Sequence, residues 1–323
     1  MRTLSLFAFV IGIELYAYQA LATIFPGSSI LPIIYFSITA ILIAAVLLFV
    51  NAGLKKRVNL PRGVLTGTFF MLFIPKLFTA ILLLGEDIVR LGKTLAMGIV
   101  HVAGNESFYL GTERSLVWSI ISVSIAGLLS LSFVYGALFN VYNYKVRKVN
   151  VKLMKLPKAF DGLKVVQISD IHSGSLTDKA AVQKAVEKIN SLHPDVIFFT
   201  GDLVNNLATE AVSFVDVFKH LQAPHGVYSV LGNHDYGDYA AWPSEESKQN
   251  NLNMLKKIHG EMGWRLLLNE HVKIEKDGEK IVVAGVENWS ASGRFHSYGK
   301  LDAALHGIQD AITVLLLSHD PSH

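Results

Sequence analysis

Residues 165–174 read VVQISDIHSG, a short apolar run rich in β-branched residues that ends in an Asp-x-His triplet. Runs of this kind predict buried strands, and similar runs recur along the second half of the chain. The predicted strands are Leu163–Ser169, Asp195–Thr200, Gly226–Leu231, Lys280–Ala284 and Ile312–Leu317.

The segments between these strands carry apolar residues at helical spacing. Helices are predicted over residues 178–192, 210–221 and 245–262, with Thr177 as the N-cap of the first. Strands that alternate with helices indicate βαβ units and a largely parallel sheet. His271–Glu275 and Lys280–Ala284 predict an antiparallel hairpin across Lys276-Asp277-Gly278, so the expected architecture is a mixed sheet with helices outside it.

Polar side chains stand where four of the predicted strands end. They are Asp170 and His172 after the first strand, Gly201 and Asp202 after the second, Gly232, Asn233, His234 and Asp235 after the third, and His319 after the last. Because the carboxyl ends of parallel strands share one edge of a sheet, where α/β domains bind ligands, we expect these side chains to converge. Caps and turns explain any one motif, but not the ordered set.

The residue types at this edge are those of a two-metal hydrolytic site. A bridging carboxylate holds two divalent ions about 3.5–4 Å apart, and a hydroxide between the ions is a nucleophile at neutral pH. A histidinium near the leaving oxygen supplies a proton or a charge. Oxygen and nitrogen ligands without sulfur suit Mn, Fe or Zn, and Mn is the first expectation. The predicted cofactors are therefore two divalent metal ions.

The series D-x-H, G-D, G-N-H-D and H resembles that of the calcineurin-like metallophosphoesterase superfamily, over roughly residues 163–323. The stretches FFTGDLVNN (198–206), VLGNHDYG (230–237) and LLLSHDPSH (315–323) look most like the bacterial membrane-associated branch of that superfamily. The resemblance implies an α/β metallophosphoesterase domain, built as a mixed β-sandwich flanked by helices. It also implies hydrolysis of a phosphomono- or diester by attack of a metal-bridging hydroxide.

The resemblance implies a role for each matched residue. The metal ligands would be Asp170 and His172 for the first ion, Asp202 as the bridge, and Asn233 and His319 for the second ion. His234 would be a catalytic residue beside the leaving-group oxygen, with Asp235 as its orienting partner. Candidates for binding substrate are Asn205, next to Asn206, and Asn288 and Arg294, which share a polar loop with Trp289 and His296.

The family pattern ends in G-H-x-H, whereas this sequence stops at Ser322-His323. In the family those two histidines complete the ligand sets of both metals. We expect the sequence to be a fragment of a longer gene product, with a domain incomplete at its C-terminus and Ile312–Leu317 at an exposed sheet edge. The alternative is a catalytically impaired membrane protein that uses a partial phosphoesterase domain as a binding or scaffolding module.

The first 145 residues are a different kind of sequence. In the whole chain 51% of residues are hydrophobic and 17% are charged, against roughly 25% charged in soluble domains, and the deficit lies almost entirely before residue 145. Apolar segments at about 4–25, 30–50, 64–84 and 116–141 are long enough to cross a bilayer as helices. A signal peptide is the alternative for the first segment, and buried core helices for any one of them.

These patterns divide the chain into a four-helix transmembrane region (1–145), a basic linker (146–160) and a partial phosphoesterase domain (161–323). Basic residues between the second and third segments, and after the fourth, place the domain on the cytoplasmic side by the positive-inside rule. The resemblance places the protein in a bacterial inner membrane. The expected partners are membrane lipids and a phosphoester that is lipid-linked or nucleotide-linked.

Nucleic acid is not an expected partner, because the basic residues cluster beside apolar runs rather than on one face, and the net charge is only +3. The absence of cysteine excludes a disulfide framework and a thiolate metal site.

Two ionisable residues fall inside predicted spans, Glu14 in the first and Lys76 in the third. Such groups are costly in hydrocarbon, so we expect either an interhelical ion pair or a snorkelling Lys76 with Glu14 in a polar interior. Asp87–Val100 has helical periodicity and is predicted as an amphipathic helix on the outer interface. Scattered charges give little support to a transporter or sensor.

Overall fold

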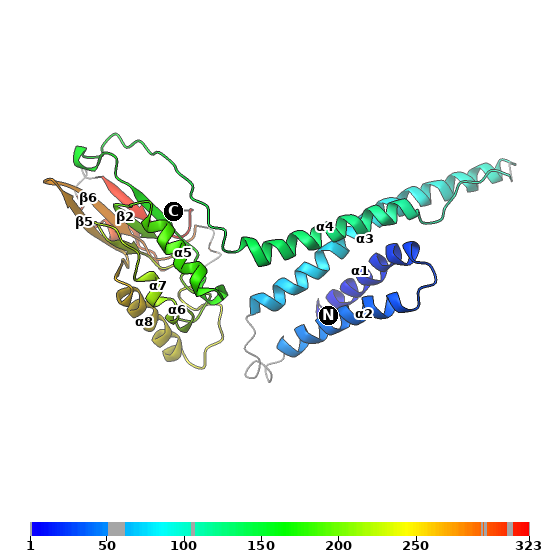
Figure 1. The fold of residues 1–323 in the computed structure, drawn as a ribbon, viewed down its shortest axis with the longest axis horizontal. Coiled ribbons are helices and arrows are strands. Elements are labelled where there is room, and N and C mark those ends of the chain that lie inside the picture. Colours follow the sequence, from blue (N-terminus) through cyan, green and yellow to red (C-terminus); the bar gives the residue numbers. More distant parts are fainter. Residues whose placement is uncertain are drawn as a thin grey trace. The chain divides into compact units, whose positions relative to one another are not determined.

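The computed structural model describes residues 2–50, 62–104, 107–291, 293, 296–308 and 313–322. It divides into two compact units, residues 1–143 and residues 144–323. Within the described residues the first unit is helical, and the second combines strands with helices (Figure 1).

The helices of the first unit are α1 (Arg2–Ile24), α2 (Ile30–Val50), α3 (Arg62–Val102) and α4 (Leu116–Tyr135), and α4 continues as a π-helical turn, Gly136–Asn140. Helices α3 and α4 lie side by side (Figure 1). In the described part of the chain, Gly67–Val102 and Leu116–Tyr135 are long and apolar enough to cross a membrane. The apolar parts of α1 and α2 are shorter, Ala8–Ile24 and Ile30–Ile41, so these two spans stay predictions.

Helix α3 corrects the sequence analysis, because the predicted third span and the predicted interfacial helix Asp87–Val100 are one continuous helix of 41 residues. At 1.5 Å per residue its length is about 60 Å, roughly twice the hydrocarbon core of a bilayer. Pro75 is the proline inside the helix, and no proline follows it to end the helix before Val102. Arg90 pairs with Asp87 at 2.7 Å, an i,i+3 pair that stabilises the helix at this point.

A polar cluster joins α1, α2 and α3. Lys76 Nζ lies 2.8 Å from Glu14 Oε2 and donates to Thr39 Oγ1 at 2.8 Å. Thr39 in turn donates to the Glu14 carboxylate at 3.0 Å. The predicted interhelical ion pair is therefore confirmed, and each charge has a partner inside the unit, as buried charges require.

The second unit contains a four-stranded parallel sheet in the order β1-β2-β3-β4 and a three-stranded sheet in the order β5-β6-β7. The strands of the parallel sheet are β1 (Val165–Ile168), β2 (Val196–Phe199), β3 (Val227–Ser229) and β4 (Trp264–Leu266). Sequence analysis missed β4, because three residues are too few to show a period of two. Its register beside β3, with Trp264 opposite Val227, comes from pairing across the sheet.

The second sheet contains the predicted hairpin. Strands β5 (Glu270–Lys276) and β6 (Glu279–Gly285) are antiparallel, and β7 (Val314–Leu317) runs parallel to β6 at the edge of the sheet. Asp277 and Gly278 between β5 and β6 both have positive φ, as a two-residue type I′ turn requires.

Strand β2 is buried along its whole length, which explains its unbroken apolar sequence. Val196 and Phe198 belong to one core cluster with Ile281 and Val283 of β6, so the two sheets share a core. Phe199 packs instead against His259 of α8 (Glu245–Glu261), with ring centroids 6.0 Å apart. The parallel sheet therefore lies between the second sheet and a layer of helices.

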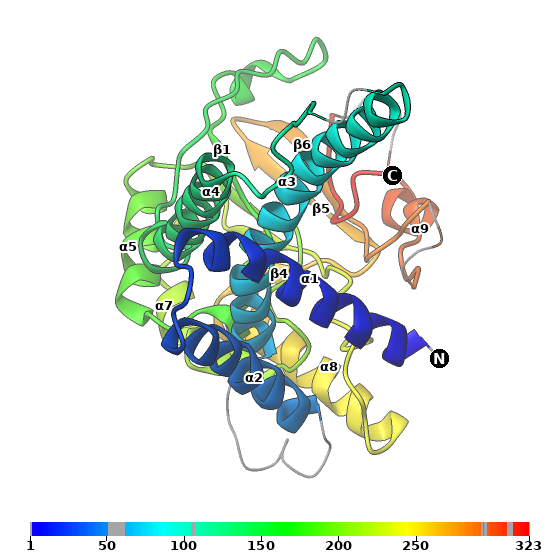
Figure 2. The same ribbon diagram turned by 90° about the vertical axis from the view of Figure 1, so that its right-hand side faces the viewer.

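The remaining helices are α5 (Lys179–Asn190), α6 (Thr209–Val212), α7 (Val215–Phe218) and α9 (Leu301–Leu305), the last of which lies beside β5 (Figure 2). Two predictions were wrong here. The N-cap of α5 is Asp178, whose side chain accepts from the Ala181 amide at 3.0 Å, and not Thr177. The helix predicted over 210–221 is two short helices, Thr209–Val212 and Val215–Phe218, separated by Ser213 and Phe214.

Candidate metal centre

The turns that follow β1 and β2 have an unusual backbone. Asp170, His172 and Asp202 have φ values of 54°, 46° and 60°, a left-handed conformation that non-glycine residues seldom adopt. The two turns hold each other in place, since the Asp170 amide donates to the Gly201 carbonyl and the His172 amide to the Asp202 carbonyl, both at 3.0 Å. Such conformations cluster at functional sites, where the surrounding structure fixes them.

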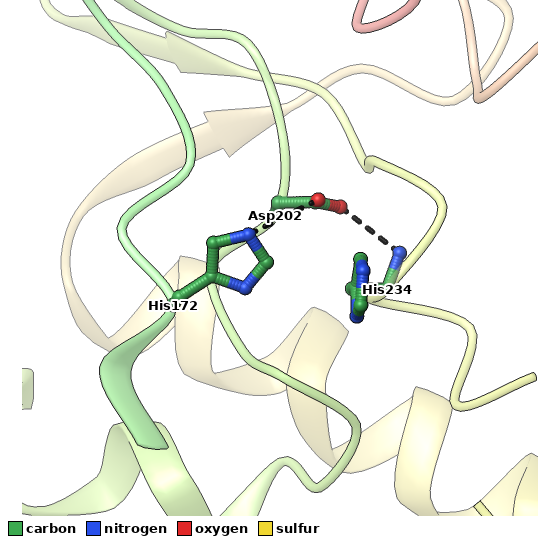
Figure 3. Close-up of side chains that lie close together, drawn as sticks. All are labelled: His172, Asp202 and His234. Atoms are coloured by element: carbon green, nitrogen blue, oxygen red, sulfur yellow. Dashed lines mark hydrogen bonds and ion pairs between the residues drawn. The ribbon is translucent and has the colours of Figure 1, made fainter. Parts of the chain in front are cut away.

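The carboxylate of Asp202 lies at the centre of the converging side chains. The residue is 2% exposed, and its Oδ2 is 3.5 Å from Nε2 of both His172 and His319. Its Oδ1 accepts a hydrogen bond from the His234 backbone amide at 2.9 Å. Figure 3 shows the His172 and His234 rings beside this carboxylate, with ring centroids 4.9 Å apart.

Two groups of side chains bring ligand atoms within 4.8 Å of one another: His172, Asp202 and His234, and Asp170, Asp202 and His319. Asp202 belongs to both groups. Asn233 adjoins the second group, since its Oδ1 lies 3.1 Å from His319 Nε2. The structure thus brings together every residue that sequence analysis named as a metal ligand. It also places His234, named as a catalytic residue, among the potential ligands.

The hydrogen bonds of His319 test whether this site fits a cation. Its Nδ1 lies 2.8 Å from the Thr200 carbonyl oxygen, which can only accept, so Nδ1 carries the proton. In a neutral ring, Nε2 then directs a lone pair toward Asp202 Oδ2 and Asn233 Oδ1. Acceptor atoms that face one another without a donor are stabilised by a cation. Carboxylate, amide oxygen and imidazole without sulfur fit Mn, Fe or Zn.

Asp235 lies beneath the site and does not pair with the His234 ring. Its Oδ2 accepts from the amides of Asp202 and Gly232, and its Oδ1 from those of Leu203 and Val204, at 2.8–3.2 Å. Burial and the neighbouring Asp202 carboxylate raise the pKa of Asp235 to about 7. The hydrogen bonds from the backbone amides act in the opposite direction, because they favour the charged form. The buried carboxylate therefore holds two turns together.

The partner of the His234 ring is Asn205, whose carbonyl oxygen lies 2.8 Å from His234 Nδ1. This corrects the predicted pairing of His234 with Asp235. A carbonyl oxygen can only accept a hydrogen bond, so Nδ1 of His234 is the donor. Nε2 is the ring nitrogen that takes no part in this bond. The Asn205 side chain itself donates to Ser175 Oγ at 3.1 Å.

The predicted substrate residue Asn288 is buried within its own loop. Asn288 is 1% exposed, and its Nδ2 donates to the His296 carbonyl at 3.0 Å. Its backbone carbonyl accepts from the amides of Tyr298 and Gly299. Asn288 therefore fixes the backbone of its loop, and its burial does not fit the predicted contact with substrate. Arg294 lies outside the described residues.

Sequence analysis missed Tyr239. Its hydroxyl accepts a hydrogen bond from Asn233 Nδ2 at 2.8 Å, and its ring centroid lies 4.6 Å from that of His234. Because the amino group of Asn233 is held by this hydroxyl, the amide oxygen is the atom that faces His319. No spacing rule connects a tyrosine to a ligand six residues before it, so the sequence alone gave no signal.

Comparison with known proteins supports these observations. Residues 163–323 match the family described as calcineurin-like phosphoesterase, and residues 1–141 match a family described as the transmembrane domain of probable calcineurin-like phosphoesterases. The chain is 28% identical over 239 residues to a transmembrane protein with metallophosphoesterase domain from Danio rerio, which covers 72% of this chain and 50% of that protein. The chain spans about half the length of the animal relatives it matches.

Two bacterial proteins are also similar. The uncharacterized metallophosphoesterase YkoQ of Bacillus subtilis is 26% identical over 206 residues, which is 62% of this chain and 69% of YkoQ. The UDP-2,3-diacylglucosamine pyrophosphatase LpxG of Chlamydia trachomatis is 40% identical over 98 residues, 30% of each chain. The chain therefore belongs to the calcineurin-like phosphoesterases, and it joins an N-terminal transmembrane-type domain to an α/β metallophosphoesterase domain with a parallel sheet.

Proposed function

We propose that this chain is a membrane-anchored, metal-dependent phosphoesterase that hydrolyses a phosphomono- or diester. The observation that carries the proposal is the pair of ligand groups that share the buried Asp202 carboxylate. Two divalent ions, with Mn as the first choice, would supply a nucleophilic hydroxide and neutralise phosphoryl oxygens when bound. Their ligands would be Asp170, His172, Asp202, Asn233 and His319.

The proposed roles of the other residues follow from their hydrogen bonds. His234 donates from Nδ1 to the Asn205 carbonyl, so its Nε2 can hold the proton that the leaving oxygen receives. Asp235 keeps the turns that carry Asp202 and Gly232 at a fixed separation.

The proposed substrate is a phosphoester at the bilayer, lipid-linked or nucleotide-linked. Support comes from the transmembrane-type domain and from the similarity to a protein named as a UDP-2,3-diacylglucosamine pyrophosphatase. A membrane anchor raises the local concentration of a lipid substrate. We further propose that four helices span a bacterial inner membrane and that the phosphoesterase domain, a mixed sandwich of two sheets, faces the cytoplasm.

The proposal is tested by metal titration of the purified full chain in detergent. Metal-free protein should gain activity toward an aryl phosphate mono- or diester when Mn is added. Asp202→Ala should abolish turnover, and His234→Ala should lower it about 100- to 10,000-fold. Asp216→Ala changes an exposed carboxylate on α7 and should leave turnover intact.

Unchanged turnover in Asp202→Ala would refute the mechanism. Protein that binds Mn but hydrolyses none of the esters would favour the scaffolding alternative. Orientation can be tested separately, because the chain has no cysteine. A cysteine placed at the exposed Lys257 should react with an impermeant maleimide only after the membrane is permeabilised.

A further inference from the structure

The second unit begins with an exposed basic segment, residues 144–155, which reads YKVRKVNVKLMK. All twelve residues are exposed, and none of residues 144–153 is in a helix or strand. The basic residues are Lys145, Arg147, Lys148, Lys152 and Lys155, and no acidic residue occurs between positions 115 and 160. The predicted linker 146–160 therefore has two parts. Residues 146–155 are exposed, whereas residues 156–160 lead into the domain core, where Phe160 is fully buried.

Apolar side chains in the basic segment are also exposed. Val149 is 80% exposed and Val151 is 72% exposed, and Met154 is fully exposed. Apolar surface in water is unfavourable, and a run of it beside charged residues is typical of an interaction site.

Both ends of the basic segment are fixed to the domain. Lys188 Nζ donates to the Tyr144 carbonyl, and Thr313 Oγ1 donates to the Lys155 carbonyl at 2.7 Å. Leu156, the next residue, packs against the core cluster. The basic segment is therefore attached to the domain surface at both ends. A surface that binds this segment would also hold the domain in place.

The position of the segment in the chain indicates its partner. Tyr144 follows Asn140, the end of the helical stretch that includes α4, by four residues, and α4 is long and apolar enough to cross a membrane. Four extended residues reach at most about 14 Å. Basic juxtamembrane segments are attracted to anionic lipid headgroups, and apolar side chains between them enter the boundary between headgroups and acyl chains.

We propose that residues 144–155 bind the surface of an anionic lipid leaflet. The five basic residues contact headgroups, and Val149, Val151 and Met154 enter the interfacial region. This contact holds the domain at the bilayer surface, where the proposed lipid-linked substrate would lie. It concerns attachment and not hydrolysis, so its test does not depend on the proposed function.

A single cysteine provides the probe, since the natural chain has none. The full chain with Val151→Cys is labelled with an environment-sensitive fluorophore and reconstituted into vesicles that contain spin-labelled quencher lipid. One set of vesicles is phosphatidylcholine alone, and the other also contains phosphatidylglycerol. The control is Lys257→Cys, at a side chain that is 78% exposed on α8.

Quenching at position 151 should be stronger in anionic than in neutral vesicles and should weaken with added salt, while the control stays unquenched in both. Each basic residue changed to glutamine should lower the ratio of bound to free segment about fivefold, the equivalent of about 1 kcal/mol per charge. Changing Lys145, Arg147, Lys148 and Lys152 together should remove the difference between the vesicles. Equal quenching in both vesicles, or no more quenching than at position 257, would overturn the proposal. A blue-shifted but unquenched probe would then show that the basic segment lies against protein rather than lipid.

Discussion

Tyr239→Phe should weaken the binding of one of the two proposed metal ions and leave the other unchanged. The substitution keeps the ring beside His234 and removes the hydroxyl that accepts from Asn233 Nδ2 at 2.8 Å. Without that hydroxyl the amide of Asn233 is free to rotate, and its amino group can take the place of the oxygen that faces His319. The amide oxygen is the atom that can bind a metal, so the second ion is the one affected.

The magnitude follows from one neutral hydrogen bond, which contributes about 0.5–1.5 kcal/mol. Tyr239 is 44% exposed, so water competes for the Asn233 amino group and the lower half of that range applies. We therefore expect the Kd of the second ion to rise about two- to fivefold. Metal-free protein titrated with Mn, with free Mn followed by electron paramagnetic resonance, resolves the two binding steps.

Two further variants test whether the effect comes from the orientation of the Asn233 amide or from general disruption of the site. Tyr298→Phe removes a hydroxyl that donates to Asp238 and should leave both Mn affinities unchanged. In an Asn233→Asp background both side-chain atoms are oxygens, so Tyr239→Phe should lose its effect. An unchanged second Kd in Tyr239→Phe, or an equal effect in the Asn233→Asp background, contradicts the reasoning.

Three further outcomes are expected of the full chain in detergent. Burial lowers the pKa of His259 to about 3, so the unfolded chain binds the extra proton below pH 6.5. Between pH 7 and pH 5 the natural chain should lose about 2 kcal/mol of unfolding free energy relative to His259→Gln, and denaturant titration at both pH values measures the difference. Lys76→Met should destabilise the chain by about 3–5 kcal/mol because it leaves Glu14 buried without its partner, and the double change Lys76→Met with Glu14→Leu should restore most of the melting temperature. Mn at about 100 times its Kd should stabilise the chain by about 2.7 kcal/mol, a thermal shift that Asp202→Ala should abolish.

The convergence of the candidate ligand residues could be predicted because local pattern and sheet topology agree. An apolar run such as residues 196–199 forms a strand that is buried on both faces. The first polar residues after such a run mark the end of the strand, and they therefore lie at the edge of the sheet. Three parallel strands in register then place Asp170, Asp202 and Asn233 at the same edge. This inference needs no side-chain detail, which is why it was within reach of the sequence.

The roles of Tyr239 and Asp235 could not be predicted, because they depend on contacts between turns. Asp235 follows His234 directly, and the family resemblance made it the expected partner of that ring. The backbone amides that donate to its carboxylate include those of Leu203 and Val204, more than 30 residues earlier in the chain. A carboxylate that satisfies backbone amides of another loop cannot be told from one that orients a side chain until both loops are placed.

The continuity of α3 could not be predicted either, because it also depends on contacts between residues that are distant in the sequence. The predicted third span ends at about residue 84, just before Glu86 and Asp87. Arg114, which precedes α4, lies 3.0 Å from Glu86 and 2.9 Å from Asp87, and the Tyr16 hydroxyl donates to Asp87 at 2.6 Å. Because residues distant in sequence neutralise these charges, the helix continues through a position that local pattern marks as its boundary.

The site itself is held by bonds that do not involve the ligand atoms. Amides of Asp170, His172 and Ser173 donate to carbonyls of Gly201, Asp202 and Leu203 in turn, and Asp235 ties the same turn to Gly232. These bonds fix the left-handed backbone at the ligand positions, so a bound ion does not have to order the loops. A structural zinc site folds its domain on binding, whereas here backbone hydrogen bonds between the turns hold the candidate ligand positions, so we expect metal binding and folding to be separate events. Metal-free chain should therefore keep its far-ultraviolet circular dichroism and cooperative unfolding, and Asp202→Ala, which leaves the backbone amide of residue 202 in place, should remain folded while losing the ions.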